Sequence, residues 1–84
     1  MNLSITKTFG EERIRTVLGD KRVVQPHVAF ESDERYGNGH WTFSANGWQG
    51  TGVDITLEMF KALQELVNNP KVIEYYNKLE NNND

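Results

Sequence analysis

The sequence predicts an α+β domain in which an N-terminal antiparallel sheet of four or five strands precedes a C-terminal helix. Apolar and polar residues alternate through most of the first 55 residues, which is the period of half-buried strands. Turn signals that contain glycine separate the alternating runs. After residue 56 the apolar spacing changes to three and four residues, and this is the period of an amphipathic helix.

The first strands are predicted at residues 3–9 and 13–18. The first run places Leu3, Ile5 and Phe9 on one face, and the second places Arg13 and Arg15 opposite its apolar residues, because successive strand side chains point to opposite faces. Gly19-Asp20 predicts a two-residue hairpin turn into the next strand, residues 21–30. Pro26 interrupts that strand and predicts an edge position or a bulge there, because proline donates no backbone hydrogen bond.

Two more strands are predicted around the tryptophans. The charged, glycine-containing stretch 31–39 is typical of a loop. A strand over 40–45 then carries Trp41 and Phe43 on one face, and Asn46-Gly47 predicts a turn into a strand over 48–55. Glycines 50 and 52 indicate a bulge or a close backbone approach in this last strand.

The helical segment is predicted to begin near Leu57, with Thr56 or Asp54 capping its free N–H groups. Asn68-Asn69-Pro70 predicts a break or kink, since proline cannot supply the next helical hydrogen bond. A second short helix, or a kinked continuation, follows. We expect residues 1–79 to form one domain and the acidic, Asn-rich residues 80–84 to be a disordered tail.

Composition restricts the compartment and the partners. The chain has no cysteine, which excludes disulfides and Cys-type zinc sites, and no apolar stretch approaches the length of a membrane helix. We therefore expect a cytoplasmic protein. The net charge is −3, and the acidic excess lies in residues 54–84, where three Lys stand against six Asp and Glu. Duplex-DNA binders are normally basic overall, so any nucleic-acid surface must be a local patch.

No catalytic or metal site is predicted. His27 and His40 lie in separate strands without a metal-ligand spacing, and no serine stands in a nucleophile-elbow motif. The glycine-rich segment 47–52 lacks the lysine of a phosphate-binding P-loop. We therefore expect a non-enzymatic protein that uses no cofactor.

Basic residues interleave with aromatic residues along the predicted sheet. Single-strand binding uses this combination, because cations follow the phosphates while aromatic rings stack on bases. The alternative is that Trp41 belongs to the core and that the arginines are an ordinary solvated face. The predicted nucleic-acid-binding residues are Lys7, Arg13, Arg15, Lys21, Arg22, Trp41 and Trp48, with Tyr36 and His40 in the wider constellation.

Residues 52–63 resemble the strand-to-helix junction of the positive cofactor four (transcriptional coactivator) family of single-stranded DNA-binding domains. In that family an aliphatic strand that begins with glycine ends in a short polar cap, and an acidic residue, an aromatic and a leucine begin the helix. The matching residues are Gly52, Val53, Ile55, Glu58, Phe60 and Leu63. The resemblance implies a homodimer that packs its helices together and holds unpaired DNA on its sheets.

Two functions follow from these patterns. The first hypothesis is a binder of single-stranded DNA or RNA, in phage or bacterial replication or transcription. The alternative is a small protein-interaction module, an inhibitor or adaptor that uses a sheet edge or its acidic helical surface. We also expect a homodimer, because the helical segment offers more apolar surface than a small sheet covers. The predicted interface residues are Phe60, Leu63, Leu66, Val72, Ile73 and Tyr76.

Overall fold

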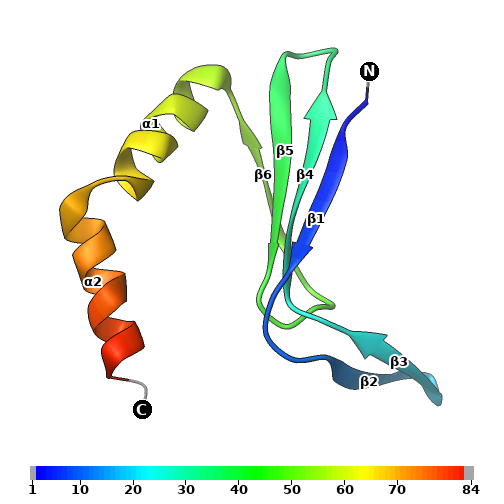
Figure 1. Cartoon of the computed structure of the whole chain (residues 1–84). Helices are drawn as coiled ribbons and strands as arrows, with labels where there is room; N and C mark the ends of the chain where they lie inside the picture. Colours follow the sequence, from blue (N-terminus) through cyan, green and yellow to red (C-terminus); the bar gives the residue numbers. More distant parts are fainter. Residues whose placement is uncertain (1, 83–84) are drawn as a thin grey trace.

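The structure is a computed structural model that describes residues 2–82, and it confirms the α+β class (Figure 1). Four strands form an antiparallel sheet in the order β1-β4-β5-β6. Two further strands form a separate hairpin, and two helices follow the last strand of the sheet. The sheet strands are β1 (Ser4–Thr8), β4 (His27–Asp33), β5 (Asn38–Ser44) and β6 (Thr51–Ile55).

One face of the sheet is apolar. The register aligns Ile5 with Phe30, Phe30 with Trp41, and Trp41 with Val53 across the four strands. Residues paired across antiparallel strands point to the same side, so these four side chains share what we call the apolar face. The opposite face carries threonines, both histidines and the carboxylates of β4 and β6, as the predicted alternation requires.

Strands β2 (Arg13–Val17) and β3 (Asp20–Val24) form a hairpin that projects from one end of the sheet (Figure 1). Its turn is Leu18-Gly19, one residue earlier than the predicted Gly19-Asp20, because Val17 pairs with Asp20. Both turn residues have positive φ, 50° at Leu18 and 85° at Gly19. This is the backbone of a type I′ hairpin turn, which matches the twist of the strands.

The helices form an arm beside the sheet. Helix α1 (Leu57–Val67) is capped by Thr56, whose side chain accepts a hydrogen bond from the Met59 N–H. Helix α2 (Pro70–Asn81) begins after Asn69, whose side chain accepts from the Lys71 N–H, and proline occupies its first turn. The predicted break at Asn68–Pro70 is therefore a sharp elbow between two capped helices (Figure 1).

The arm leaves the apolar face open. Phe60 of α1 stacks on Trp41, with ring centroids 6.2 Å apart, but α2 stands away from the sheet (Figure 1). The Cα radius of gyration is 16.2 Å, against about 12 Å for a compact domain of this length. Among residues 2–82 no apolar side chain of the aliphatic or aromatic type is fully buried. One copy of the chain therefore has no closed core.

Several element boundaries differ from the sequence prediction. Pro26 separates two strands, β3 and β4, instead of interrupting one. Strands β4 and β5 extend into the predicted loop 31–39 and leave a short turn at residues 34–37. Helix α2 continues to Asn81, so residues 80 and 81 are helical and the predicted disordered tail was wrong for them; residues 83–84 lie outside the described residues. Neither helix is long and apolar enough to span a membrane.

Candidate nucleic-acid interface

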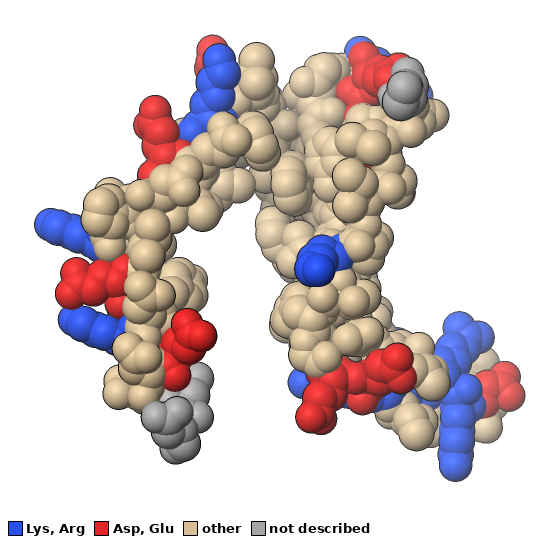
Figure 2. Space-filling view, viewed as in Figure 1, with Lys and Arg blue, Asp and Glu red and all other residues tan. Residues whose placement is uncertain are grey.

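Three arginines share one face of the β2–β3 hairpin. The register pairs Arg13 with Val24 and Arg15 directly with Arg22, so all three guanidinium groups project from the same side, as the alternation predicted for the first two. Basic side chains gather over this hairpin in Figure 2, with acidic ones near its tip and its base. We call Arg13, Arg15 and Arg22 the arginine face.

The arginine face forms no ion pair within residues 2–82, although Asp20 lies on the same side of the hairpin at its tip. The ion pairs formed within residues 2–82 involve Arg35 with Asp33, His40 with Asp54, and Lys78 with Glu74, and none includes the arginine face. Like charges directly opposite each other on paired strands destabilise the pairing. Arg15 and Arg22 are such a pair. An anion that bridges the two guanidinium groups would relieve this repulsion, and phosphate suits them because arginine binds it through two parallel hydrogen bonds.

Trp48 completes this surface. The Arg15 guanidinium carbon lies 5.3 Å from the centre of the Trp48 ring, which is within the range of a cation–π contact. Trp48 as a whole remains 40% exposed. A flat, partly exposed ring beside guanidinium groups is the combination that single-strand-binding proteins use, with cations for the phosphates and rings for the bases.

The β5–β6 loop positions Trp48. The Asn46 carboxamide oxygen accepts hydrogen bonds from the N–H groups of Trp48 and Gln49, at 3.1 and 2.9 Å. The buried Ser44 hydroxyl donates to the Gln49 carbonyl and accepts from the Gly47 N–H. These four bonds fix a six-residue loop where the sequence predicted a two-residue turn.

Gly47 brings this loop against the base of the hairpin. Its φ is +92°, and a Cβ atom at this position would lie 2.7 Å from the Gln25 backbone nitrogen. Gln25 in turn donates its side-chain amide to the Gly10 carbonyl at 3.0 Å. The loop that carries Trp48 therefore contacts the segment where the chain leaves the hairpin and enters β4. The positions of the hairpin and of Trp48 are coupled through this backbone contact.

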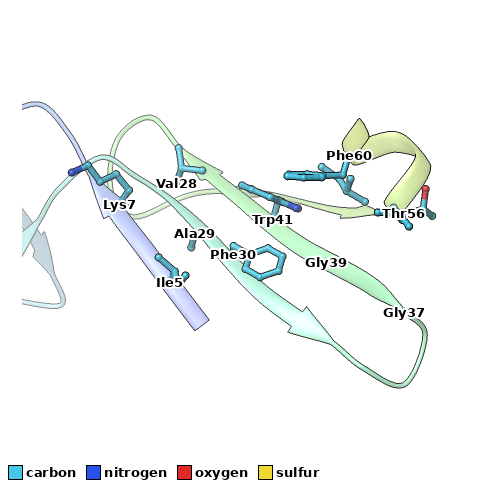
Figure 3. A pocket seen from close by; sticks show the side chains of 12 residues that line it. Ile5, Lys7, Val28, Ala29, Phe30, Gly37, Gly39, Trp41, Thr56 and Phe60 are labelled. Carbon is cyan, nitrogen blue, oxygen red and sulfur yellow. The ribbon is translucent and has the colours of Figure 1, made fainter. Parts of the chain in front are cut away.

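The other predicted binding residues lie elsewhere. Lys21 pairs with Thr16 and so occupies the opposite side of the hairpin. Lys7 and Trp41 line a groove on the apolar face of the sheet (Figure 3). His40 is on the polar face, where its Nδ1 lies 2.8 Å from an Asp54 carboxylate oxygen. Tyr36 is in the β4–β5 turn, at the end of the sheet away from the hairpin (Figure 1).

Sequence reasoning did not identify the residues that build this loop. Ser44, Asn46 and Gln25 act through hydrogen bonds or backbone contacts and not through charge or ring stacking. Asn46-Gly47 gave a turn signal, but the signal did not show that the turn faces the hairpin. Arg22 was predicted from its charge alone, and the strand register is what places it opposite Arg15.

The predicted interface residues of the helical segment are open to solvent or half-buried. Leu66 and Tyr76 are more than half exposed, and no residue of either helix is buried. Phe60 is half-buried because its ring lies on Trp41. Their apolar side chains thus have no cover within one copy of the chain.

Within the described residues, no group of three histidine or acidic side chains is placed to hold a metal ion. Comparison with known proteins gave no match: no family model, curated protein or solved structure resembles the chain closely enough to be assigned to it. The arrangement of its own residues is therefore the basis on which a function is proposed.

Proposed function

We propose that the protein binds single-stranded nucleic acid, DNA or RNA, through the arginine face of its hairpin and the ring of Trp48. The observation that carries the proposal is the direct pairing of Arg15 with Arg22, neither of which forms an ion pair within residues 2–82. Repulsion between the two arginines destabilises the free protein. A bound phosphate removes that repulsion, and the free energy released favours binding.

Size and charge favour a single strand over a duplex. The arginine face spans two five-residue strands, which is about 17 Å of backbone, and the whole chain is acidic, with net charge −3. A duplex presents a phosphate charge about every 1.7 Å along its axis and requires a broad basic surface. A single strand instead exposes bases that a tryptophan ring stacks on.

The test is fluorescence anisotropy with a labelled oligothymidylate of about 16 nucleotides, near the upper site size for one small binding domain. We expect anisotropy to rise with protein at low salt and to fall as salt is added, because bound phosphates have released their counterions. A duplex of equal length is expected to compete more weakly than the unlabelled single strand. No anisotropy change at low salt contradicts the proposal.

A protein-binding function is the second candidate, and the free edges of the sheet favour it. Strands β1 and β6 each have one edge unpaired within the described chain, and an extended peptide can add to such an edge through backbone hydrogen bonds. This function predicts that a bound protein protects backbone amides of β1 or β6 from hydrogen exchange and leaves the hairpin amides unchanged.

We further propose that the protein acts as a homodimer through its helical segment, with Phe60, Leu63, Leu66, Val72, Ile73 and Tyr76 in the interface. Their exposed or half-buried side chains support this proposal. A symmetric dimer carries two hairpins, and two arginine faces that hold the same strand would bind it more tightly than one, since the second contact is intramolecular.

A further inference from the structure

The apolar face of the sheet contains an open groove. It has a volume of about 490 Å³ and runs beneath α1, with Ile5, Val28 and Phe30 on its floor and Trp41 and Phe60 toward α1 (Figure 3). Gly39 leaves room for the Phe30 ring, which lies against the position a Cβ would take. Lys7 is the one charged residue among the side chains that line the groove in the described chain.

The chain exposes far more surface than a complete domain of its mass. Its accessible surface is 7286 Å², whereas a folded monomer of 9.7 kDa exposes about 5,100 Å². The excess is about 2,200 Å² per chain. Two copies that cover this excess would bury about 4,400 Å² in total, which is within the range of obligate dimers.

Helix α2 has the dimensions and the chemistry to fill the groove. Its apolar stripe consists of Val72, Ile73, Tyr76 and Leu79, which recur at helical spacing; Val72 is half-buried in the single chain and the other three are exposed. The helix has 12 residues and is therefore about 18 Å long. The seven-residue strands β4 and β5 beneath the groove are about 23 Å long. Both partners are thus apolar and matched in length.

One pair of opposite charges is available as well. Glu80 follows the stripe at the C-terminal end of α2, where the helix dipole is negative, and it forms no ion pair within residues 2–82. Lys7 in the groove also has no ion-pair partner there. The last turn of α2 also holds Lys78, which pairs with Glu74, so Glu80 is the carboxylate left to approach Lys7 when the helix lies in the groove.

The elbow directs α2 away from the groove of its own chain (Figure 1). The Asn68 N–H donates to the Gln64 carbonyl and the Asn69 N–H to the Leu66 carbonyl at the end of α1, and the Asn69 carbonyl accepts from the N–H groups of Val72 and Ile73 at the start of α2. With the cap on the Lys71 N–H, these bonds end one helix and begin the next at Asn68 and Asn69. In this arrangement α2 does not cover the groove of its own chain, so the groove is open to a second copy.

We propose that α2 of a second copy of this chain occupies the groove, and that each copy gives its α2 to the other in a symmetric exchange. The interface then has two equal seats, each formed by the sheet of one copy and the arm of its partner. In this arrangement the apolar face of the sheet forms one side of each contact. The interface therefore includes more than the helical residues proposed above. The exchange uses neither the arginine face nor Trp48, so its test is independent of nucleic-acid binding.

Complementation between two variants tests the exchange. Ile5→Glu places a charge in the groove, and Tyr76→Glu places one in the α2 stripe. Each variant alone has two defective seats, and we expect its dimer dissociation constant to rise at least about 100-fold. A mixture of the two contains heterodimers with one intact seat, formed by the normal arm of the first and the normal groove of the second. The mixture is expected to dimerise more tightly than either variant alone.

Matched controls distinguish loss of the contact between groove and helix from a general loss of the fold. Thr6→Glu lies next to Ile5 on the same edge strand but on the opposite face, and Lys78→Glu lies about 160° round the helix from Tyr76. Both are expected to remain dimeric by sedimentation equilibrium. Failure of the mixture to regain dimer, or a monomeric mass for the unsubstituted chain at tens of micromolar, overturns the exchange.

If either glutamate variant fails to fold, cross-linking tests whether α2 lies in the groove of the other copy. The chain has no cysteine, so Val28→Cys in the groove and Ile73→Cys in the stripe provide unique sites. A mixture of the two single variants is expected to give cross-linked dimer with a short bis-maleimide, and the chain that carries both is expected to link between copies. A link within one chain would show that α2 lies in the groove of its own chain, and this contradicts the exchange. A link formed when only the Ile73→Cys variant is present would show that two α2 helices pack on each other, and this also contradicts it.

Discussion

The stability of this protein is predicted to depend on its concentration. A monomer without a buried apolar core cannot offset the conformational entropy that folding removes, so folding and dimerisation are expected to be one transition. For such a transition, raising the protein concentration about 100-fold stabilises the native dimer by about 2.7 kcal/mol. Unfolding also exposes the surface buried between the two copies. We therefore take a urea m-value at the upper end of the range for small proteins, about 3 kcal/mol/M. The urea midpoint then rises by about 0.9 M.

Far-UV circular dichroism and tryptophan fluorescence measure this shift, because the helices and the two tryptophans report on different parts of the chain. Both signals are expected to give the same midpoint at each concentration. Ile5→Glu should lower the midpoint throughout, whereas Thr6→Glu, on the other face of β1, should leave it nearly unchanged. Curves that superimpose over the whole concentration range would refute the reasoning, since they would show a core closed within one chain.

Three further substitutions test particular contacts. Gly47→Ala is expected to destabilise the protein by about 2–4 kcal/mol in chemical denaturation, because its Cβ would contact the Gln25 backbone and its φ is positive; Gly37→Ala, with positive φ but open space, should cost only about 1–2 kcal/mol. Leu18→Asn should raise stability by about 0.5–1 kcal/mol in the same assay, since Leu18 is 100% exposed at φ 50° and asparagine tolerates that turn conformation. Trp48→Ala should weaken single-strand binding by about 1–3 kcal/mol without changing its salt dependence, because a neutral ring displaces few ions.

Each of these results has a contradicting outcome. Equal effects of the two glycine substitutions would show that the contact with Gln25 is not formed. A loss of stability in Leu18→Asn would indicate that the leucine side chain is covered in the native assembly. A change in the salt dependence for Trp48→Ala, measured by anisotropy, would mean that the ring positions the arginines and does not stack on a base.

The sequence predicts the elements well because local rules determine them. Alternation placed Arg13 opposite Ile14, and the strand register confirms it. The change of period placed the start of α1, and Thr56 caps it as expected. The break at Asn68–Pro70 followed from the chemistry of proline and the capping ability of asparagine. These features depend on a few neighbouring residues, and such residues are visible in one sequence.

What covers the sheet could not be predicted. An apolar face has the same pattern whether it packs on a helix of its own chain or on a second copy, so Trp41 and Ile5 gave no sign that the groove is open. The sequence predicts part of the arginine face, because alternation places Arg13 and Arg15 on the same side of their strand. Its other half depends on the pairing with Arg22, and the contact with Trp48 depends on hydrogen bonds from Asn46.

Salt titration of binding tests the proposed function most directly. Three arginines that each neutralise a phosphate of a single strand give a slope of about −2 in log affinity against log salt for each hairpin. The variant with Arg13→Gln, Arg15→Gln and Arg22→Gln is expected to lose that slope, about 2 units per hairpin, together with most of its affinity at low salt. Lys21→Gln, on the opposite side of the same hairpin, should keep the slope. A triple variant that retains the full slope and affinity would contradict the assignment of the arginine face as the nucleic-acid-binding surface.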